Sequence, residues 1–556
     1  MYVYKITQKY NMELNGFSRL PWVRVGKQSE FSDSRTFDCD TTIASMAGFF
    51  EIQLGVLASF CGIAMIFERY SLKTGSENRT AGRNDEDEIH LGGLSKASDS
   101  LAIRYLGIYA IVMGSDWLQG PYVYSLYREQ YRFTERQVAI LFVTGFIAAG
   151  TSGPFVGVWA DQHGRKKLCR IFCLTYAGSC LVIQQPFFPL LLVGRLLGGI
   201  STAILFSVFE SWLVAAYQGL PAALAFSSTA PGVKDAISKA LSRTMGHASL
   251  VNGIVAAVAG IVANWIVEQT SGFRGPFMLS GALLVLTFFI IGTQWDENYG
   301  TGASSGTVAV AGGELTKLKQ AIGLVRREPA YLVLGFTQTC FEGSMYLFVF
   351  LWVPSLQEAG GTSLPLGYIF SAFMISMMLG SIVYTTIVAT ATIPETTALP
   401  ANGHTNGHSN HRNPVHDTLV VLHAKLAALI CGFAALLFAY SASGETLSIE
   451  RRFWAFCAFE ACVGMYYPVM GMLRGSLVPN EVRATLSSLF RVPLNIFVTC
   501  ALLTGVSSAR HMVFAGCSML LAVASLACAF VLIKRSEEFV TPQAGENGER
   551  TPNYTD

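Results

Sequence analysis

Charged residues are what this sequence has least of. Asp, Glu, Lys and Arg make up 14% of its 556 residues, whereas a soluble domain carries about 25% charged residues. The hydrophobic share is 51% and the mean hydropathy is +0.42. These values exclude an ordinary soluble fold and predict a polytopic membrane protein. The net charge of +2 gives no electrostatic reason to expect a nucleic-acid partner.

Motifs for nucleotide-driven or metal-dependent chemistry are also missing. The sequence contains no Gly-x-x-x-x-Gly-Lys-Ser/Thr phosphate loop and no His-Glu-x-x-His, the patterns that supply a phosphate cradle and a zinc site. Its 12 Cys form no Cys-x-x-Cys pair and lie mostly in apolar runs, so we interpret them as packing residues. We therefore expect no enzyme activity, no cofactor and no metal.

Long apolar runs recur along the chain, each of about the length that crosses a bilayer. The first is Met46–Phe67, and twelve more follow. A long polar loop after the sixth of the twelve divides them into two groups of six. We therefore predict an all-α polytopic membrane protein, with two six-helix bundles and one extra N-terminal transmembrane helix. The twelve predicted spans are 101–123, 137–159, 168–186, 188–214, 244–268, 274–293, 329–353, 364–389, 417–440, 452–473, 484–506 and 511–534.

The polar stretches between these runs set the predicted domains. In chain order these are a polar tail, the extra helix, a charged linker, the N-terminal bundle, a central cytoplasmic loop, the C-terminal bundle and a second polar tail. Their limits are 1–45, 46–67, 68–100, 101–293, 294–328, 329–535 and 536–556. A polar loop at 391–416 carries His404, His408, His411 and His416. Its low-complexity composition favours a solvated loop over a metal site.

A short charged turn joins the second and third of the twelve spans. Gly157 has room for a close helix approach, Asp161 is placed to accept from helix N-terminal amides or to pair with an arginine, and Gly164 is typical of a helix end. Lys and Arg are more than twice as numerous in the loops on this side, which predicts that it is cytoplasmic. The predicted gating residues are Gly157, Asp161, Gly164, Arg165 and Lys166.

Ionisable side chains inside spans are costly and usually functional. Arg491 has Asn495 one turn further on the same helix face, and its planar guanidinium suits an oxyanion. Arg243 holds the corresponding place in the first bundle. Glu460 we interpret as structural, and Arg195 as either a substrate contact or a partner of an acidic neighbour. The predicted substrate-binding residues are Arg491, Asn495, Asp116, Gln119, Tyr122, Glu342 and Arg195.

Two sets of motifs resemble known transporters. The turn Gly157-x-x-x-Asp-x-x-Gly-Arg-Lys-Lys167 resembles a signature of the major facilitator superfamily, and the segment Arg195–Thr202 is a second pattern typical of it. Four further segments resemble the molybdate-anion transporter family within that superfamily, and the resemblance spans residues 101–535. These segments are Asp116–Tyr124, Phe206–Trp212, Phe341–Trp352 and Phe490–Leu494.

The resemblance implies the major facilitator fold and high-affinity import of molybdate, a tetrahedral oxyanion, by secondary active transport. An acidic residue such as Glu342 or Asp116 is expected to take up a coupled proton. We expect a multi-pass protein of the lipid bilayer, in the plasma membrane rather than an internal one. A porter for sugar or another small solute, recognised by Gln119, Asn495 and Trp352, is the alternative within transport. A non-transporting membrane receptor or scaffold is the alternative from another class.

Overall fold

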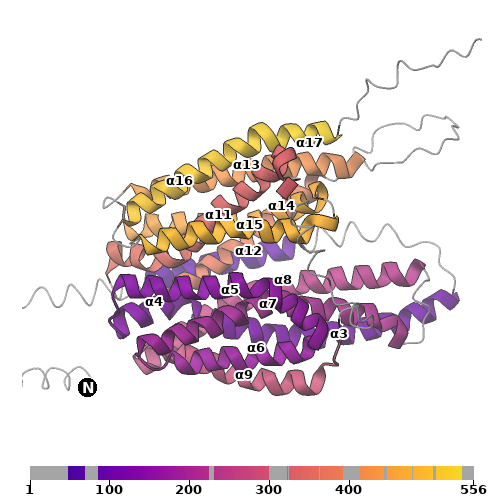
Figure 1. Ribbon diagram of the computed structural model, residues 1–556, viewed down its shortest axis with the longest axis horizontal. Coiled ribbons are helices and arrows are strands. Elements are labelled where there is room, and N and C mark those ends of the chain that lie inside the picture. Colours follow the sequence, from indigo (N-terminus) through magenta and orange to yellow (C-terminus); the bar gives the residue numbers. More distant parts are fainter. Residues whose placement is uncertain are drawn as a thin grey trace, which may run out of the picture. The chain divides into compact units, whose positions relative to one another are not determined.

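The computed structural model describes residues 48–68, 85–223, 231–299, 322–323, 325–361, 364–391, 414–443, 447–478, 480–504 and 509–540. In this part of the chain every regular element is a helix (Figure 1). The chain divides into two units, Met1–Gly48 and Phe49–Asp556, and apart from Gly48 only the second unit is described. The predicted tail 1–45, residues 541–556 of the predicted tail 536–556, and most of the loops 294–328 and 391–416 lie outside the described residues. His404, His408 and His411 are among the residues not described, whereas His416 belongs to the helix Pro414–Ala442.

The main helices reproduce the predicted spans in number and order. The extra N-terminal helix runs from Gly48 to Glu68. The others are α3 Asp85–Trp117, α5 Glu135–His163, α6 Arg165–Val182, α7 Phe188–Ala223, α8 Pro231–Thr270, α9 Gly275–Gln294, α11 Pro329–Gly360, α12 Leu366–Ala391, α13 Pro414–Ala442, α14 Ile449–Leu477, α15 Asn480–Leu503 and α16 Arg510–Ala527, the last continued by η4 Cys528–Leu532 and α17 Ile533–Val540.

The first of the twelve spans differs from its predicted limits. α3 begins at Asp85, inside the stretch predicted as a linker, and ends at Trp117 instead of 123. Gly120 and Pro121 account for the early end, because glycine weakens a helix and proline lacks the amide hydrogen. The chain continues as the 3-10 turn η2 Gly120–Tyr122, the short α4 Val123–Ser125 and the π-helical turn η3 Leu126–Gln130.

Most helices are long and apolar enough to cross a membrane. Nine helices among the described residues qualify outright, and α5 makes a tenth if its parts Glu135–Gly153 and Phe155–His163, bent by 51°, form one span. A proline stands between the two parts in the sequence, and proline is a common cause of helix bends. Together with α3, α6 and α15, each of which carries charged residues, they account for the thirteen predicted spans. The protein is therefore a multi-pass membrane protein.

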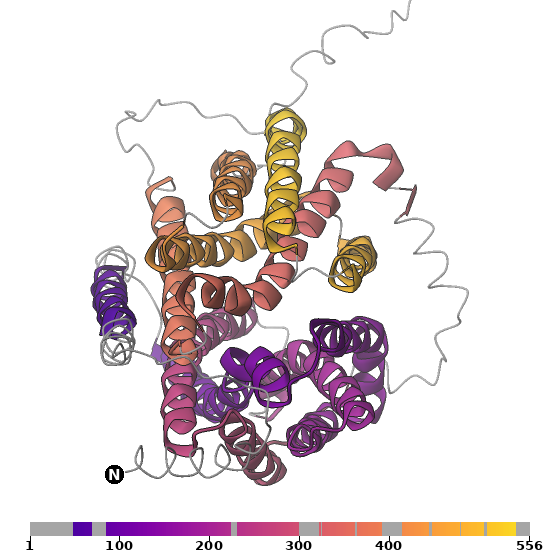
Figure 2. The ribbon, with the colours of Figure 1, turned by 90° about the vertical axis from the view of Figure 1, so that its left-hand side faces the viewer.

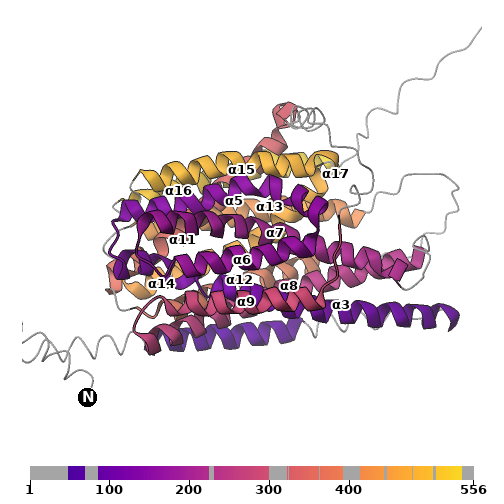
Figure 3. The same ribbon diagram turned by 60° about the horizontal axis from the view of Figure 1, so that its bottom comes forward.

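Helix packing repeats between the two bundles. In the first bundle α5 packs on α7, α6 on α7 and α9, and α3 on α8 and α9. The second bundle has the same pattern, with α12 on α14, α13 on α14 and α16, and α11 on α15 and α16. This is the pattern of a parallel duplication. Figure 2 shows most of the purple and magenta helices below the orange and yellow ones, with the indigo helix Gly48–Glu68 at the left, and Figure 3 shows the helices running side by side. The domain limits given above stay a prediction.

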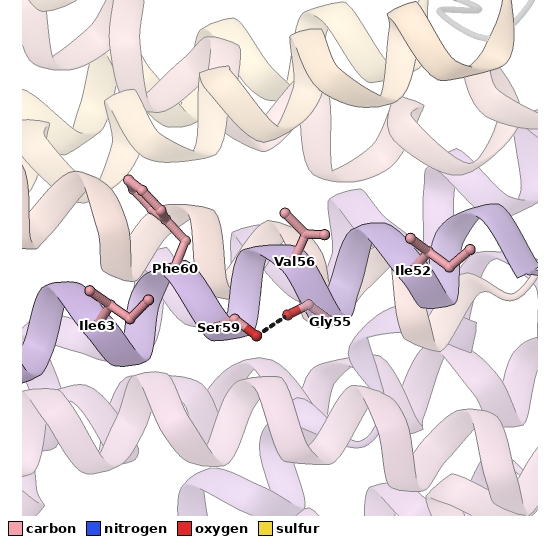
Figure 4. A pocket seen from close by; sticks show the side chains of 6 residues that line it. All are labelled: Ile52, Gly55, Val56, Ser59, Phe60 and Ile63. Atoms are coloured by element: carbon pink, nitrogen blue, oxygen red, sulfur yellow. Dashed lines mark hydrogen bonds between the residues drawn. The ribbon is translucent and has the colours of Figure 1, made fainter.

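The helix Gly48–Glu68 lies against the second bundle. The Phe50 ring centroid is 5.2 Å from that of Phe453 on α14, and the Thr385 hydroxyl of α12 donates to Glu68 Oε1 at 2.7 Å. Its opposite face is apolar and exposed, as expected of a helix that faces lipid. A shallow groove on that face is lined by Ile52, Gly55, Val56, Ser59, Phe60 and Ile63 (Figure 4).

Candidate functional site

The two bundles contact each other at one end of the helices. We call the end where α3 stops and α5 starts the α3–α5 end, and the end at the turn between α5 and α6 the α5–α6 end. At the α3–α5 end the Tyr122 hydroxyl donates to Asn264 Oδ1 of α8 at 2.7 Å and accepts from the Gly367 N–H of α12 at 3.3 Å. The Ser371 hydroxyl donates to the Ala257 carbonyl at 2.7 Å. Tyr122 therefore lies in a hydrogen-bonded contact between the bundles.

Aromatic rings extend this contact along α5 and α11. The ring centroids of Phe142 and Phe350 are 5.1 Å apart, and those of Phe146 and Tyr346 are also 5.1 Å apart. The members of each helix follow one another at four-residue spacing, so the pairs form a ladder on facing helix surfaces. Such pairs add about 0.5–1.5 kcal/mol each beyond their area burial, and here they hold the bundles together near the α3–α5 end.

Glu342 lies one turn beyond this ladder on α11 and is 8% exposed. Gln338 Nε2 donates to Glu342 Oε2 at 3.3 Å, and the Tyr466 hydroxyl donates to Oε1 at 3.5 Å. Arg474 Nη1 of α14 donates to Gln338 Oε1 at 3.1 Å. The positive charges of Arg474 and Arg491 both act on the carboxylate. A buried carboxylate needs such compensation inside a membrane, and these two arginines supply part of it.

Arg491 is exposed on α15, eleven residues after Asn480. Its guanidinium makes no hydrogen bond or ion pair with the described residues, although its charge reaches Glu342. Asn495, one turn further on, packs against Gly150 of α5, where a Cβ would lie 2.5 Å from Asn495 Nδ2. Arg243, the predicted counterpart of Arg491, differs because its Nη1 lies 4.0 Å from Asp99. Five donor hydrogens of Arg491 are thus available to a ligand.

Asp116 and Gln119 make their contacts within the first bundle. The Tyr176 hydroxyl of α6 donates to Asp116 Oδ1 at 2.5 Å, and Gln119 Nε2 donates to Ser280 Oγ of α9 at 2.9 Å. Both side chains are half-buried. These hydrogen bonds hold the end of α3 against its neighbours, so the role that the structure describes for Asp116 and Gln119 is to position that end. A contact of either residue with a substrate stays a prediction.

Arg195 is held between two aromatic rings. Its guanidinium carbon lies 5.0 Å from the Tyr127 ring centroid and 5.2 Å from that of Phe142, at a distance suited to cation–π attraction. Its Nε and Nη2 are buried without a hydrogen-bond partner among the described residues. No acidic side chain pairs with Arg195 among the described residues, so they do not support the interpretation of Arg195 as the partner of an acidic neighbour. Because Phe142 also belongs to the ladder with α11, Arg195 lies directly behind the contact between the bundles.

The charged turn between α5 and α6 follows the sequence prediction in part. α5 ends at His163, and Gly164 has a φ of 102°, as expected of a glycine helix end. Arg165 Nη2 lies 2.6 Å from Asp161 Oδ1, which is the second of the two roles foreseen for Asp161. The expected close approach at Gly157 is wrong for this conformation, because a Cβ there would meet no heavy atom within 4 Å.

Glu297 is a residue of this turn that sequence reasoning missed. Its Oε1 accepts from the Lys166 N–H at 2.8 Å and its Oε2 from the Lys167 N–H at 3.1 Å. The N–H of Arg165 also donates to the Asn298 carbonyl at 3.0 Å. Glu297 thus places a carboxylate at the N-terminus of α6, where unpaired amides and the helix dipole favour negative charge.

Gln338, Tyr466 and Arg474 were likewise missed. Arg474 falls one residue beyond the predicted span 452–473, so it counted as a loop residue, whereas α14 continues to Leu477. The spacing of Glu460, Tyr467 and Arg474 is the signal that was available, because seven-residue steps return to the same helix face. If the predicted span had been extended by one turn, this spacing would have placed Arg474 on the helix face that carries Glu460.

Comparisons with known proteins agree with this architecture. A family model described as sugar transporters with twelve transmembrane segments matches residues 60–398. A molybdate-anion transporter of Takifugu rubripes is 31% identical over 451 residues, covering 76% of this chain and 85% of that protein. One of Xenopus tropicalis is 31% identical over 456 residues, covering 81% and 89%. An auto-inhibited peptide transporter of the POT family is similar in fold alone, with a TM-score of 0.54, 11% identity and coverage of 82% and 99%.

Proposed function

Because the chain belongs to the molybdate-anion transporter family of the major facilitator superfamily, we propose that it imports molybdate by secondary active transport. The proposal takes its substrate from the names of the relatives. Under this proposal the protein works in the plasma membrane, transforms no substrate chemically and needs no cofactor. The lipid bilayer surrounds its helices.

One observation carries the proposal, namely that the guanidinium of Arg491 pairs with none of the residues that the structure describes. A cation inside a membrane is costly unless a counter-charge compensates it, and Glu342 is already shared with Arg474. A tetrahedral oxyanion would supply the missing negative charge and accept from two or more donors of a planar fork. Asn495 adds an amide donor one turn away, and the donors of Arg195 lie behind the ladder toward the α3–α5 end.

The contacts between the bundles support a mechanism of alternating access. Hydrogen bonds and aromatic pairs join the bundles at the α3–α5 end, which we place outside the cell. The α5–α6 end, which we place in the cytoplasm, carries none of these contacts among the described residues. The conformation described is then the one that releases molybdate inward. Uptake would start when the ladder parts and the bundles rock to close the α5–α6 end.

A coupled proton completes the proposal. Molybdate carries two negative charges, and each charge moved against a potential of 100 mV costs about 2.3 kcal/mol. A proton that crosses with the anion reduces this cost. Among the acids considered from the sequence, Asp116 and Glu342 both accept hydrogen bonds.

The test is uptake of labelled molybdate by a transport-deficient host that expresses this chain. Tungstate should compete, because it is also a tetrahedral oxyanion. Arg491→Ala should abolish uptake, whereas Arg491→Lys keeps the charge but loses the fork and should weaken apparent affinity about tenfold. Arg451→Ala, at an exposed arginine near the start of α14, is the matched control and should leave uptake unchanged.

A structural role for Arg491 makes a different prediction. If the guanidinium only balanced an acid, removing both charges together should restore a working carrier. Arg491→Leu combined with Glu342→Leu, or with Asp116→Leu, tests this in protein shown to reach the membrane. Robust molybdate uptake by either double variant would contradict anion binding by Arg491.

A further inference from the structure

Three carboxyl groups in the interior of the described spans are buried or half-buried, and they differ in their partners. Asp116 accepts from the Tyr176 hydroxyl. Glu342 accepts from Gln338 and Tyr466, and two arginines act on it. Glu460 accepts from no donor and pairs with no cation among the described residues. Of the three, only Glu460 would carry its negative charge without compensation.

Glu460 is also the most deeply placed of the acids on α14. It is 6% exposed and lies eleven residues after Ile449, which corresponds to about 16 Å of helix rise. The sequence prediction put it near the start of its span, but α14 extends further at both ends. Its helix packs closely on α12, since a Cβ at Gly464 would collide with the Met377 backbone. Solvent therefore cannot surround the carboxyl group.

Among the described residues, no charge of either sign acts on the Glu460 carboxyl group. Burial alone acts on its carboxyl group, so no charged side chain of α11, α12 or α13 reaches it among the described residues. The titratable groups that its own charge would reach are Cys457, Cys462 and Tyr467, all on α14. Ser376 of α12 is close to Cys457. An ionised Glu460 would thus be a lone buried anion, and the protonated form is the one that this site accommodates.

Tyr467 links Glu460 to the proposed anion site. It lies two turns beyond Glu460 on the same face of α14 and is 43% exposed. The charges of Glu460, Glu342 and Arg474 all act on its hydroxyl. A proton that enters or leaves Glu460 by way of this exposed ring therefore passes the group of residues that contains Glu342. Binding of an anion there and release of a proton from Glu460 are then electrostatically coupled.

We propose that Glu460 is the group that carries the coupled proton. This rests on the proposed function. The proton binds a carboxylate oxygen from water on the outer side, crosses as part of the neutral acid and returns to water on the inner side. No bond other than O–H is made or broken. Asp116 and Glu342, which the sequence suggested for this task, position neighbouring groups through the hydrogen bonds that they accept.

The first experiment uses purified full-length protein in liposomes, with and without an imposed pH gradient that is acidic outside. For the wild type, one pH unit should change molybdate accumulation about tenfold if one proton crosses with each anion. In Glu460→Gln the ratio of accumulation with and without the gradient should fall to one. Glu450→Gln, the same change at an exposed position on the same helix, should keep the wild-type ratio. A wild-type ratio for Glu460→Gln, or a ratio of one for Glu342→Gln alone, would overturn the proposal.

A second measurement needs no transport and no variant. A lipid-soluble carbodiimide adds to a protonated carboxyl group in an apolar site, and the adduct keeps all atoms of both reactants. Mass spectrometry of the wild-type protein should find the adduct at Glu460 and not at Glu450, and its yield should fall as pH rises. An absent adduct, or a yield independent of pH, would contradict a proton at Glu460. Labelling of Glu460 in a protein that moves no molybdate would support the proton site and refute the proposed substrate.

Discussion

Gly260 and Gly246 lie on one face of α8 but have different surroundings. A Cβ at Gly260 would lie 2.7 Å from the Gly367 carbonyl oxygen of α12, whereas a Cβ at Gly246 would meet nothing within 4 Å. Gly253 lies midway between them, and a Cβ at Gly253 would lie 2.7 Å from Met378 Cγ. α8 and α12 thus touch toward the α3–α5 end and separate toward the α5–α6 end.

The pair α5 and α15 shows the same difference. The Asn495 side chain fills the space beside Gly150, whereas a Cβ at Gly157, seven residues further, would meet no atom within 4 Å. Two separate contacts between the bundles therefore close at one end and part at the other. Small residues let helices approach closely in a membrane, so glycines at the parted end have a use if α12 and α15 approach them in another conformation. One structure thus contains both the contacts of its own conformation and positions left vacant for contacts in another.

The largest effect should come from filling the closed end. Gly260→Leu places a branched side chain against the α12 backbone, and overpacking of this kind costs about 1–3 kcal/mol or more. The bundles can then no longer close at the α3–α5 end, so we expect uptake to fall to background and the unfolding temperature in detergent to drop. Uptake and unfolding of Gly260→Ala should be intermediate. Wild-type uptake by Gly260→Leu would show that this contact is dispensable.

A smaller effect on stability, with a large effect on uptake, should follow at the open end. Gly246→Leu and Gly157→Leu meet no atom in this conformation, so its stability should change by less than about 0.5 kcal/mol. The added side chains should nevertheless block closure of the α5–α6 end and reduce uptake at least about tenfold, the factor that 1.4 kcal/mol produces. Gly55→Leu, on the exposed face of the first helix, is the control and should transport normally. Normal uptake by both variants would mean that this end never closes through these helices.

Hydropathy and loop charge predicted the helices, their number and the pairing of the two halves, because membrane length and turn residues are local properties of the sequence. The end of α3 was predicted less well, because the span was extended to residue 123 although Gly120 and Pro121 disfavour a helix there and α3 ends at Trp117. The rotation of each helix about its axis was not predictable, because it depends on which partner each face meets. Gly157 was therefore assigned a contact that it lacks here. Arg474 was counted as a loop residue because the predicted end of its span fell one residue short of it.

The smallest effect should come from the turn that borders the open end. Glu297→Gln removes the carboxylate that accepts from the Lys166 and Lys167 amides, and loss of such a cap costs about 1 kcal/mol. Asp161→Asn breaks an ion pair whose aspartate is 52% exposed, and exposed pairs contribute about 0.2–1 kcal/mol. Both changes act inside the first bundle, so uptake should fall less than in Gly246→Leu while the unfolding temperature drops slightly. Loss of uptake in Asp161→Asn as complete as in Gly246→Leu, at unchanged stability, would contradict a local role. It would mean that Asp161 leaves Arg165 and meets α15 when the α5–α6 end closes, which is the same approach that the vacant position at Gly157 allows.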